Sequence, residues 1–92
     1  MTWIVKLSRK AEKQKAKLSK ALRQTLYALV YDIETKGAVR GDWPNYGKLA
    51  DGKHHCHLKI GNPTYVAVWV ELDKKIKLVE VVYVGTHEKA PY

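Results

Sequence analysis

Two apolar runs in the second half of the chain constrain its fold most strongly. Tyr65–Leu72 (YVAVWVEL) and Ile76–Val84 (IKLVEVVYV) are rich in β-branched and aromatic residues, which favour extended structure. Only Asp73-Lys74-Lys75 lies between them, so the two strands must be joined by a tight turn and run antiparallel. Because Tyr65–Leu72 is nearly all apolar, we expect a central strand that is covered on at least one face.

Two further segments complete the predicted sheet. Lys53–Ile60 alternates between apolar and polar residues and ends at a turn signal, Gly61-Asn62-Pro63. It therefore predicts a third strand of the same antiparallel meander. Near the N-terminus, Thr2–Leu7 is dominated by β-formers that alternate with Lys6, which predicts a short strand that joins the sheet.

Helical periodicity marks the chain between these strands. Apolar side chains recur at i, i+4, i+7, i+8 and i+11, which places them in one stripe along a helix. The stripe consists of Leu22, Leu26, Leu29, Val30 and Ile33. Ser19 is expected to cap the start of this helix and Gly37 to end it. Arg9–Lys17 predicts a shorter, strongly charged helix with Ser8 as its N-cap.

The order β-α-α-β-β-β predicts an α+β domain. Both helices would pack on one face of an antiparallel twisted sheet and leave the other face open. A chain of 92 residues is expected to form one domain, 1–92. Residues 38–52 predict a long connection, which in a small domain is often functional. Trp43, Tyr46 and Leu49 are expected to anchor it to the core.

The positive charge of the chain is concentrated near its N-terminus. The formal net charge is +8, and residues 1–25 carry +7 of it, from eight Lys or Arg and one acidic residue, Glu12. Such a patch indicates a polyanionic partner: nucleic acid, an anionic membrane or an acidic protein. A basic helix face that serves only solubility is the alternative.

Several absences narrow the class of protein. Cys56 is the single cysteine and cannot form an internal disulfide. The chain has no apolar run of about 18 residues and no secretory signal pattern at its start. We therefore expect a cytoplasmic protein. A Gly-rich phosphate loop, a Ser-centred elbow and a paired acidic metal motif are also missing, which disfavours nucleotide-using and metal-dependent enzymes.

Three of the four histidines fall within His54-His55-Cys56-His57. On a strand, His55 and His57 share one face, and His54 and Cys56 share the other. Histidine suits acid–base catalysis near neutral pH. A zinc site would need a further ligand such as His87, and the spacing matches no standard zinc motif. The third interpretation is a polar strand whose histidines have no chemical role.

The C-terminal tail adds candidates to the same region. His87 follows Gly85-Thr86 just after the last predicted strand, where ligands can approach a sheet. Two histidines from separate segments could then flank one reacting group. Aromatic rings that could stack bases and lysines that could neutralise phosphate occur on the strands and in the tail. They are Lys53, Lys59, Tyr65, Tyr83 and Tyr92, whereas Trp69 is expected in the core.

This pattern resembles the RelE/ParE superfamily of toxin–antitoxin toxins. The residues that carry the resemblance are a basic helical hairpin after a first strand, a strand with "CHL", the strand "YVAVWVEL", and "VGTHEKAPY" at the C-terminus. The C-terminal half is most similar to the YafQ-like branch. The resemblance implies a ribosome-dependent mRNA endonuclease that is neutralised by a small antitoxin protein.

Residue by residue, the resemblance implies roles for His57, His87 and Tyr92. They match the strand histidine, the tail histidine and the terminal aromatic of the branch. Tyr65 matches an aromatic at the start of the following strand. The chain departs from the pattern at two places: Tyr83 stands where the branch carries arginine, and Gly47 stands where it carries histidine. The arginine of the RelE central strand is missing as well.

The hypothesis that follows is RNA cleavage without a metal or other cofactor. The ribose 2′-OH would attack the adjacent phosphate and leave a 2′,3′-cyclic phosphate. His57 and His87 would move the two protons, in an order that the sequence leaves open, with His55 in reserve. Lys59 or Lys53 would stabilise the transition-state charge. Tyr92 and Tyr65 would stack bases, and Tyr83 is a further substrate-binding candidate. The alternative is a non-catalytic protein of the same fold that inhibits gyrase or only binds antitoxin or RNA.

Overall fold

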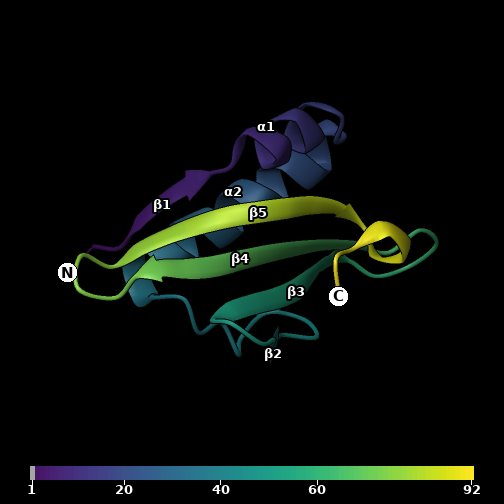
Figure 1. Cartoon of the computed structure of the whole chain (residues 1–92). Helices are drawn as coiled ribbons and strands as arrows, with labels where there is room; N and C mark the ends of the chain where they lie inside the picture. The colour runs from purple at the N-terminus through teal and green to yellow at the C-terminus, as the bar shows by residue number, and fades with distance from the viewer. Residues whose placement is uncertain (1) are drawn as a thin grey trace.

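The chain forms a five-stranded sheet with two helices on one face, as shown in Figure 1. The computed structural model describes residues 2–92. Its elements are β1 (Ile4–Leu7), α1 (Arg9–Ala16), α2 (Lys20–Lys36), β2 (Gly47–Lys48), β3 (Lys53–Lys59), β4 (Tyr65–Asp73), β5 (Leu78–Thr86) and the 3-10 helix η1 (His87–Lys89). The predicted α+β class and the predicted element order are confirmed. Within the described range, no helix is long and apolar enough to cross a membrane.

The strand order is β1-β5-β4-β3-β2. β3, β4 and β5 form the predicted antiparallel meander. β1 pairs with β5 in parallel, from Ile4↔Leu78 to Leu7↔Val81. The sheet is therefore mixed, which corrects the expectation of a wholly antiparallel sheet. The two-residue β2 was not predicted, since it lies inside the segment expected to be a connection, where it pairs Gly47 with His55.

The caps of both helices follow the sequence. Ser8 and Ser19 accept hydrogen bonds on their Oγ atoms from the backbone N–H of Ala11 at 3.1 Å and of Leu22 at 3.2 Å. Each serine thus satisfies one of the free donors at the start of its helix. Gly37 ends α2. All three predicted boundaries are confirmed.

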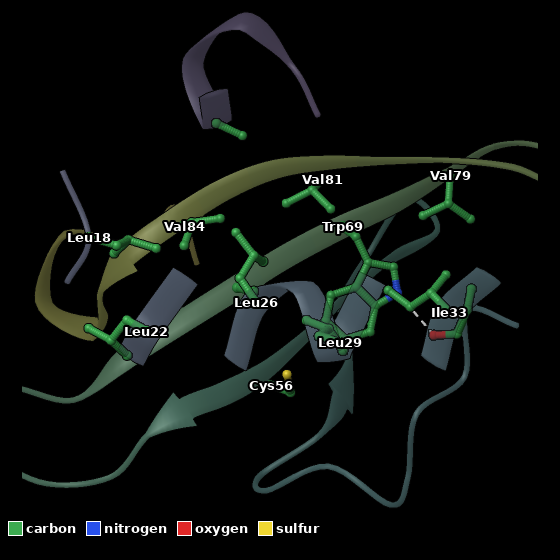
Figure 2. Packing of buried hydrophobic residues seen from close by; sticks show 13 residues of the cluster. Leu18, Leu22, Leu26, Leu29, Ile33, Cys56, Trp69, Val79, Val81 and Val84 are labelled. Atoms are coloured by element: carbon green, nitrogen blue, oxygen red, sulfur yellow. Dashed lines mark hydrogen bonds between the residues drawn. The ribbon is translucent and has the colours of Figure 1, made fainter. Parts of the chain in front are cut away.

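The helix-facing core is built by alternation along the strands. Ala67 and Trp69 of β4 and Cys56 of β3 point toward α2 and are fully buried. The leucines of α2 belong to the same buried cluster, and Figure 2 shows them with Trp69 and Cys56. The Trp69 indole N–H donates to the carbonyl of Ala38 at 2.9 Å, so the expected core role of Trp69 is confirmed, and its polar atom is satisfied.

A buried polar network fastens residues 38–52 to the sheet. The Tyr46 hydroxyl lies 2.7 Å from His54 Nδ1, and His54 Nε2 lies 3.0 Å from the Glu71 carboxylate. The Trp43 indole donates to Asp32 at 2.9 Å. The anchoring roles expected for Trp43 and Tyr46 are therefore confirmed. His54 is only 3% exposed, and its contacts give it a structural role that the sequence did not reveal.

Beyond the end of β1, the α1 helix supplies a hydrogen-bond acceptor to β5. β1 ends opposite Val81, so the following part of β5 has no strand beside it on that edge. The backbone N–H of Val84 donates instead to the side-chain amide oxygen of Gln14 at 2.9 Å. A single α1 side chain thereby satisfies a strand donor seventy residues away, which a buried backbone amide requires.

We expect Gln14→Ala to lower the free energy of unfolding by about 1–3 kcal/mol, because the Val84 N–H loses its acceptor. Alanine has the higher helix propensity, so a loss of stability reports on the hydrogen bond and not on α1. Gln24→Ala on the exposed face of α2 is the matched control, with a change below about 0.5 kcal/mol. Urea unfolding measures both. Equal stability of the two variants would contradict a role for this bond.

Candidate functional site

The structure brings His57 and His87 to one place on the open face of the sheet. Their ring centroids lie 5.7 Å apart with the planes at 73°. His57 lies on β3 and pairs with Val66 of β4, and Val66 in turn pairs with Gly85 of β5. β5 is followed by His87, whose N–H donates to the carbonyl of Thr64, just before the start of β4, at 2.8 Å. Thirty positions of sequence are thus spanned by two strand pairings and one turn.

Tyr92 joins the two histidines in a cluster with His55. Its ring centroid lies 4.5 Å from that of His55 and 5.8 Å from that of His87. Because His55 and His57 are two residues apart on β3, both rings stand on the same face. Tyr92 is 46% exposed, so its ring closes the cluster on one side while part of it still faces solvent.

A cavity of about 280 Å³ opens beside the histidine pair. Its size fits one nucleotide group and not a longer segment. The lining residues are His57, Gly61, Asn62, Pro63, Thr64, Thr86, His87 and Glu88. Apart from histidine, Glu88 is the only ionisable side chain among them. The sequence marked residues 61–63 only as a turn, and neither Thr64 nor Glu88 as part of a site.

The environment holds the inner histidines in their neutral form. Burial lowers the pKa of His57, and the nearby His87 lowers it further. Burial also lowers the pKa of His55, with smaller effects from His57 and His87. The buried Nδ1 atoms of both rings have no hydrogen-bond partner within residues 2–92. A neutral imidazole is the form that can accept a proton.

Two glycines, Gly47 and Gly85, allow side chains of the site to lie close to the backbone. A Cβ on Gly47 would lie 2.8 Å from His55 Nε2, so the ring occupies space that any other residue would fill. A Cβ on Gly85 would lie 2.7 Å from the Tyr83 hydroxyl. That hydroxyl donates to the Thr86 carbonyl at 2.7 Å. Tyr83 thus supports the turn that carries His87.

Other candidates lie away from the histidine pair. Tyr83 is 5% exposed and packs against Val66 and Val68, which corrects the expectation that its ring is available to a substrate. Tyr65 packs against the helix-side core. Lys53 shares the face of His57 but lies four residues along β3, at about 13 Å.

The expectation for Lys59 is also corrected. The pairing of β3 with β4 shifts between His57 and Lys59, so the strict alternation of faces is broken there. Lys59 lines a different cavity, on the helix side, together with Ser19 and Thr25. It therefore does not reach the cavity beside His87 as part of its wall.

The zinc interpretation finds no support in the arrangement. Residues 2–92 contain no group of three or more His, Cys, Asp or Glu side chains that could hold a metal ion. The His57 and His87 rings meet edge to face, and the His55 ring contacts Tyr92.

Comparisons with known proteins identify the fold. No family model matches the chain, and no curated protein matches it. Among solved structures, the YoeB dimer from Staphylococcus aureus has 15% identity and a TM-score of 0.72, and the match covers 95% of this chain and 99% of that chain. A metal-bound toxin from Helicobacter pylori has 21% identity and a TM-score of 0.66, with 96% and 97% covered. The toxin–antitoxin complex RelBE of Escherichia coli has 18% identity and a TM-score of 0.64, with 90% and 94% covered.

These likenesses show that the chain has the RelE-like α+β fold. They extend over nearly the whole chain, as the resemblance in sequence implied. The YafQ-like branch is not among these structures and stays a prediction.

We expect the protein to lose stability as the pH falls below about 6.5, the ordinary pKa of histidine. Since burial lowers the pKa values of His55 and His57 in the folded state, the unfolded chain binds more protons in this range and acid favours it. The stability linked to these two histidines is fully present above about pH 6.5 and is lost as the pH falls through their lowered pKa values in the folded state. Urea unfolding at pH 7.5 and 5.5 should show a smaller loss in the double variant His55→Gln/His57→Gln. An equal loss in both proteins would contradict the assignment.

Proposed function

We propose that the protein is the toxin of a type II toxin–antitoxin system and acts as a metal-independent, ribosome-dependent mRNA endonuclease. The observation that carries the proposal is the pair His57 and His87, 5.7 Å apart at the mouth of a nucleotide-sized cavity. The RelE-like fold supports it, because the RelBE structure of the same fold is a toxin–antitoxin complex.

His57 acts as the general base in this mechanism. Its lowered pKa keeps the ring neutral at pH 7, so it can take the proton of the ribose 2′-OH. The bond between O2′ and phosphorus forms, and the bond between phosphorus and the leaving 5′-oxygen breaks. His87, across the cavity, donates a proton to that oxygen. The products are a 2′,3′-cyclic phosphate and a free 5′-OH.

Charge on the transition state needs a cation close to the phosphate. None of the cavity-lining residues is Lys or Arg, so the protonated His87 imidazolium supplies the charge as well as the proton. Tyr92, in contact with His55, offers an exposed ring on which the neighbouring base can stack. Lys53, further along the same face, is placed for a flanking phosphate.

The remaining surface suits a large RNA partner. The segment 1–25 carries +7 of the net charge, and its residues 4–25 include the edge strand β1, the helix α1 and the start of α2. A basic surface of this kind attracts RNA at long range without reading its sequence. The proposed RNA partner is messenger RNA on the ribosome. The proposal also includes a cytoplasmic location and a cognate antitoxin protein as partner.

We expect His57→Ala and His87→Ala each to lower the rate of message cleavage on ribosomes by about 10²–10⁴-fold, the usual contribution of a proton-transfer group. Mapping of RNA 5′ ends measures cleavage, and growth arrest on expression follows it. Replacing the 2′-OH at the cut position by hydrogen should abolish cutting there. Tyr31→Ala, on the exposed face of α2, is the control variant purified in the same way.

The result also depends on correct folding of the variants. Thermal unfolding should show that both histidine variants keep the native transition. If His87→Ala folds and cuts as fast as the parent chain, the histidine pair is not the catalytic site. If the parent chain does not cut RNA on ribosomes either, the endonuclease proposal is wrong.

One observation favours a second candidate. The cavity that holds the histidine pair is lined by Glu88 and by no lysine or arginine, an unusual setting for stabilising a phosphorane. A non-catalytic protein of this fold, which inhibits gyrase or only binds antitoxin or RNA, would show that arrangement. Growth arrest with DNA-damage signalling and without new RNA ends would identify it.

A further inference from the structure

A second cavity lies at the edge of β5, on the side of α1. Its volume is about 230 Å³. It exists because β1 ends opposite Val81, which leaves the last part of β5 bordered by α1 and the C-terminal tail. The lining residues are Gln14, Lys17, Leu18, Tyr65, Tyr83, Val84, Gly85, Thr86 and Lys89. The mechanism proposed above uses none of the side chains from α1 or its turn.

We propose that this cavity is a second RNA subsite, which takes one nucleobase and the phosphates beside it. The inference rests on the proposed function and extends the RNA strand from the histidine pair toward the basic helices. Its floor is apolar: the half-buried ring of Tyr65 is of the kind on which a base can stack, and the nearly buried Leu18 and Val84 lie beside it.

The wall of the cavity offers a hydrogen-bond donor of fixed orientation. The Gln14 amide oxygen is occupied by the Val84 N–H at 2.9 Å, which settles which end of the amide is which. With the oxygen engaged, the NH₂ group is the end of the amide that can serve the cavity that Gln14 lines. The cavity therefore presents donors to the edge of a base and suits carbonyl and ring-nitrogen acceptors.

The charge of the second cavity is opposite to that of the first. Lys17 and Lys89 are exposed side chains on its rim, and no Asp or Glu lines it. Glu88 lines the cavity beside His57 instead. A phosphate is thus favoured at the rim of the second cavity, while the first relies on histidine.

The two cavities share one lining residue, Thr86. An RNA strand that occupies both would therefore pass this residue. Figure 1 shows η1 and the turn between α1 and α2 at the same end of the sheet. That turn is held by Arg23, whose guanidinium donates to the Leu18 carbonyl at 2.8 Å. An acidic peptide could also meet two lysines, but the apolar floor and the shared Thr86 favour RNA.

The first test removes the rim charges. Lys17→Ala/Lys89→Ala is compared with Lys74→Ala/Lys75→Ala, which removes the same charge from the β4–β5 turn at the far end of the sheet. Binding of a hexanucleotide with 2′-deoxyribose at the cut position is measured by fluorescence anisotropy over a range of salt. The rim variant should bind about tenfold more weakly, with a salt slope smaller by about 1.4, since each phosphate contact contributes about 0.7 for a single strand. The control should stay within about twofold of the parent chain.

The second test addresses the base. With the parent chain, an abasic residue at one position of the hexanucleotide should weaken binding about tenfold, the scale of one stacked base. Gln14→Glu keeps an acceptor for the Val84 N–H but turns an oxygen toward the cavity in place of NH₂. This variant should fold normally and bind the intact RNA more weakly, with a smaller abasic effect.

Three outcomes would overturn the subsite. They are equal RNA affinity of the rim variant and its lysine control, no position sensitive to base removal, or an oligoglutamate peptide that loses as much affinity as RNA in the rim variant. Because the hexanucleotide is not cut, these results are independent of catalysis. Failure of cleavage on ribosomes with the expected binding changes would remove the endonuclease proposal and leave the subsite intact.

Discussion

The alternation of side chains along β3 and β4 is the constraint on which both faces of the molecule depend. His54 and Cys56 point toward the helices, while His55 and His57 point to the open face. On β4, Trp69 fills the helix side, and Val66 and Val68 support the open side. A slip of one residue would turn Trp69 outward and the histidine pair inward. The pairing that builds the core therefore also exposes the candidate site.

Much of the fold could be predicted because its signals are local. The stripe of α2, the serine caps and the strand pair around residues 73–75 each lie within one stretch of sequence. The β3–β4 register shift is different, because it is a property of two paired strands. This register shift turns Lys59 away from the face of His57, whereas alternation in the sequence had predicted that both side chains share one face. The prediction that His57, His87 and Tyr92 share one site came from the family resemblance, because no local sequence pattern links residues so far apart.

The two departures from the branch pattern have physical counterparts in the structure. The absence of a side chain at Gly47 leaves room for the His55 ring, so a histidine on β3 fills the space there. Tyr83, where an arginine was expected, is buried and holds the Thr86 carbonyl. The position contributes to the shape of the turn and brings no cation to the cavity. At this position the chain thus has a hydrogen bond to the residue before His87 and no positive charge.

Under the proposed function, the proton-transfer groups and the lysines that attract RNA lie on different parts of the chain. The histidine cavity is lined by two histidines and one carboxylate and by no lysine or arginine, so it adds little to the capture of a polyanion. The lysines lie on α1, its turn and the tail, where water surrounds them and salt weakens their effect. Under the proposed function, capture should therefore depend on ionic strength, whereas proton removal depends on His57, whose pKa is lowered by burial. Such a site would bind RNA through one set of groups and cut it only where the strand passes His57, because the cations that attract the phosphates are not the groups that move the protons.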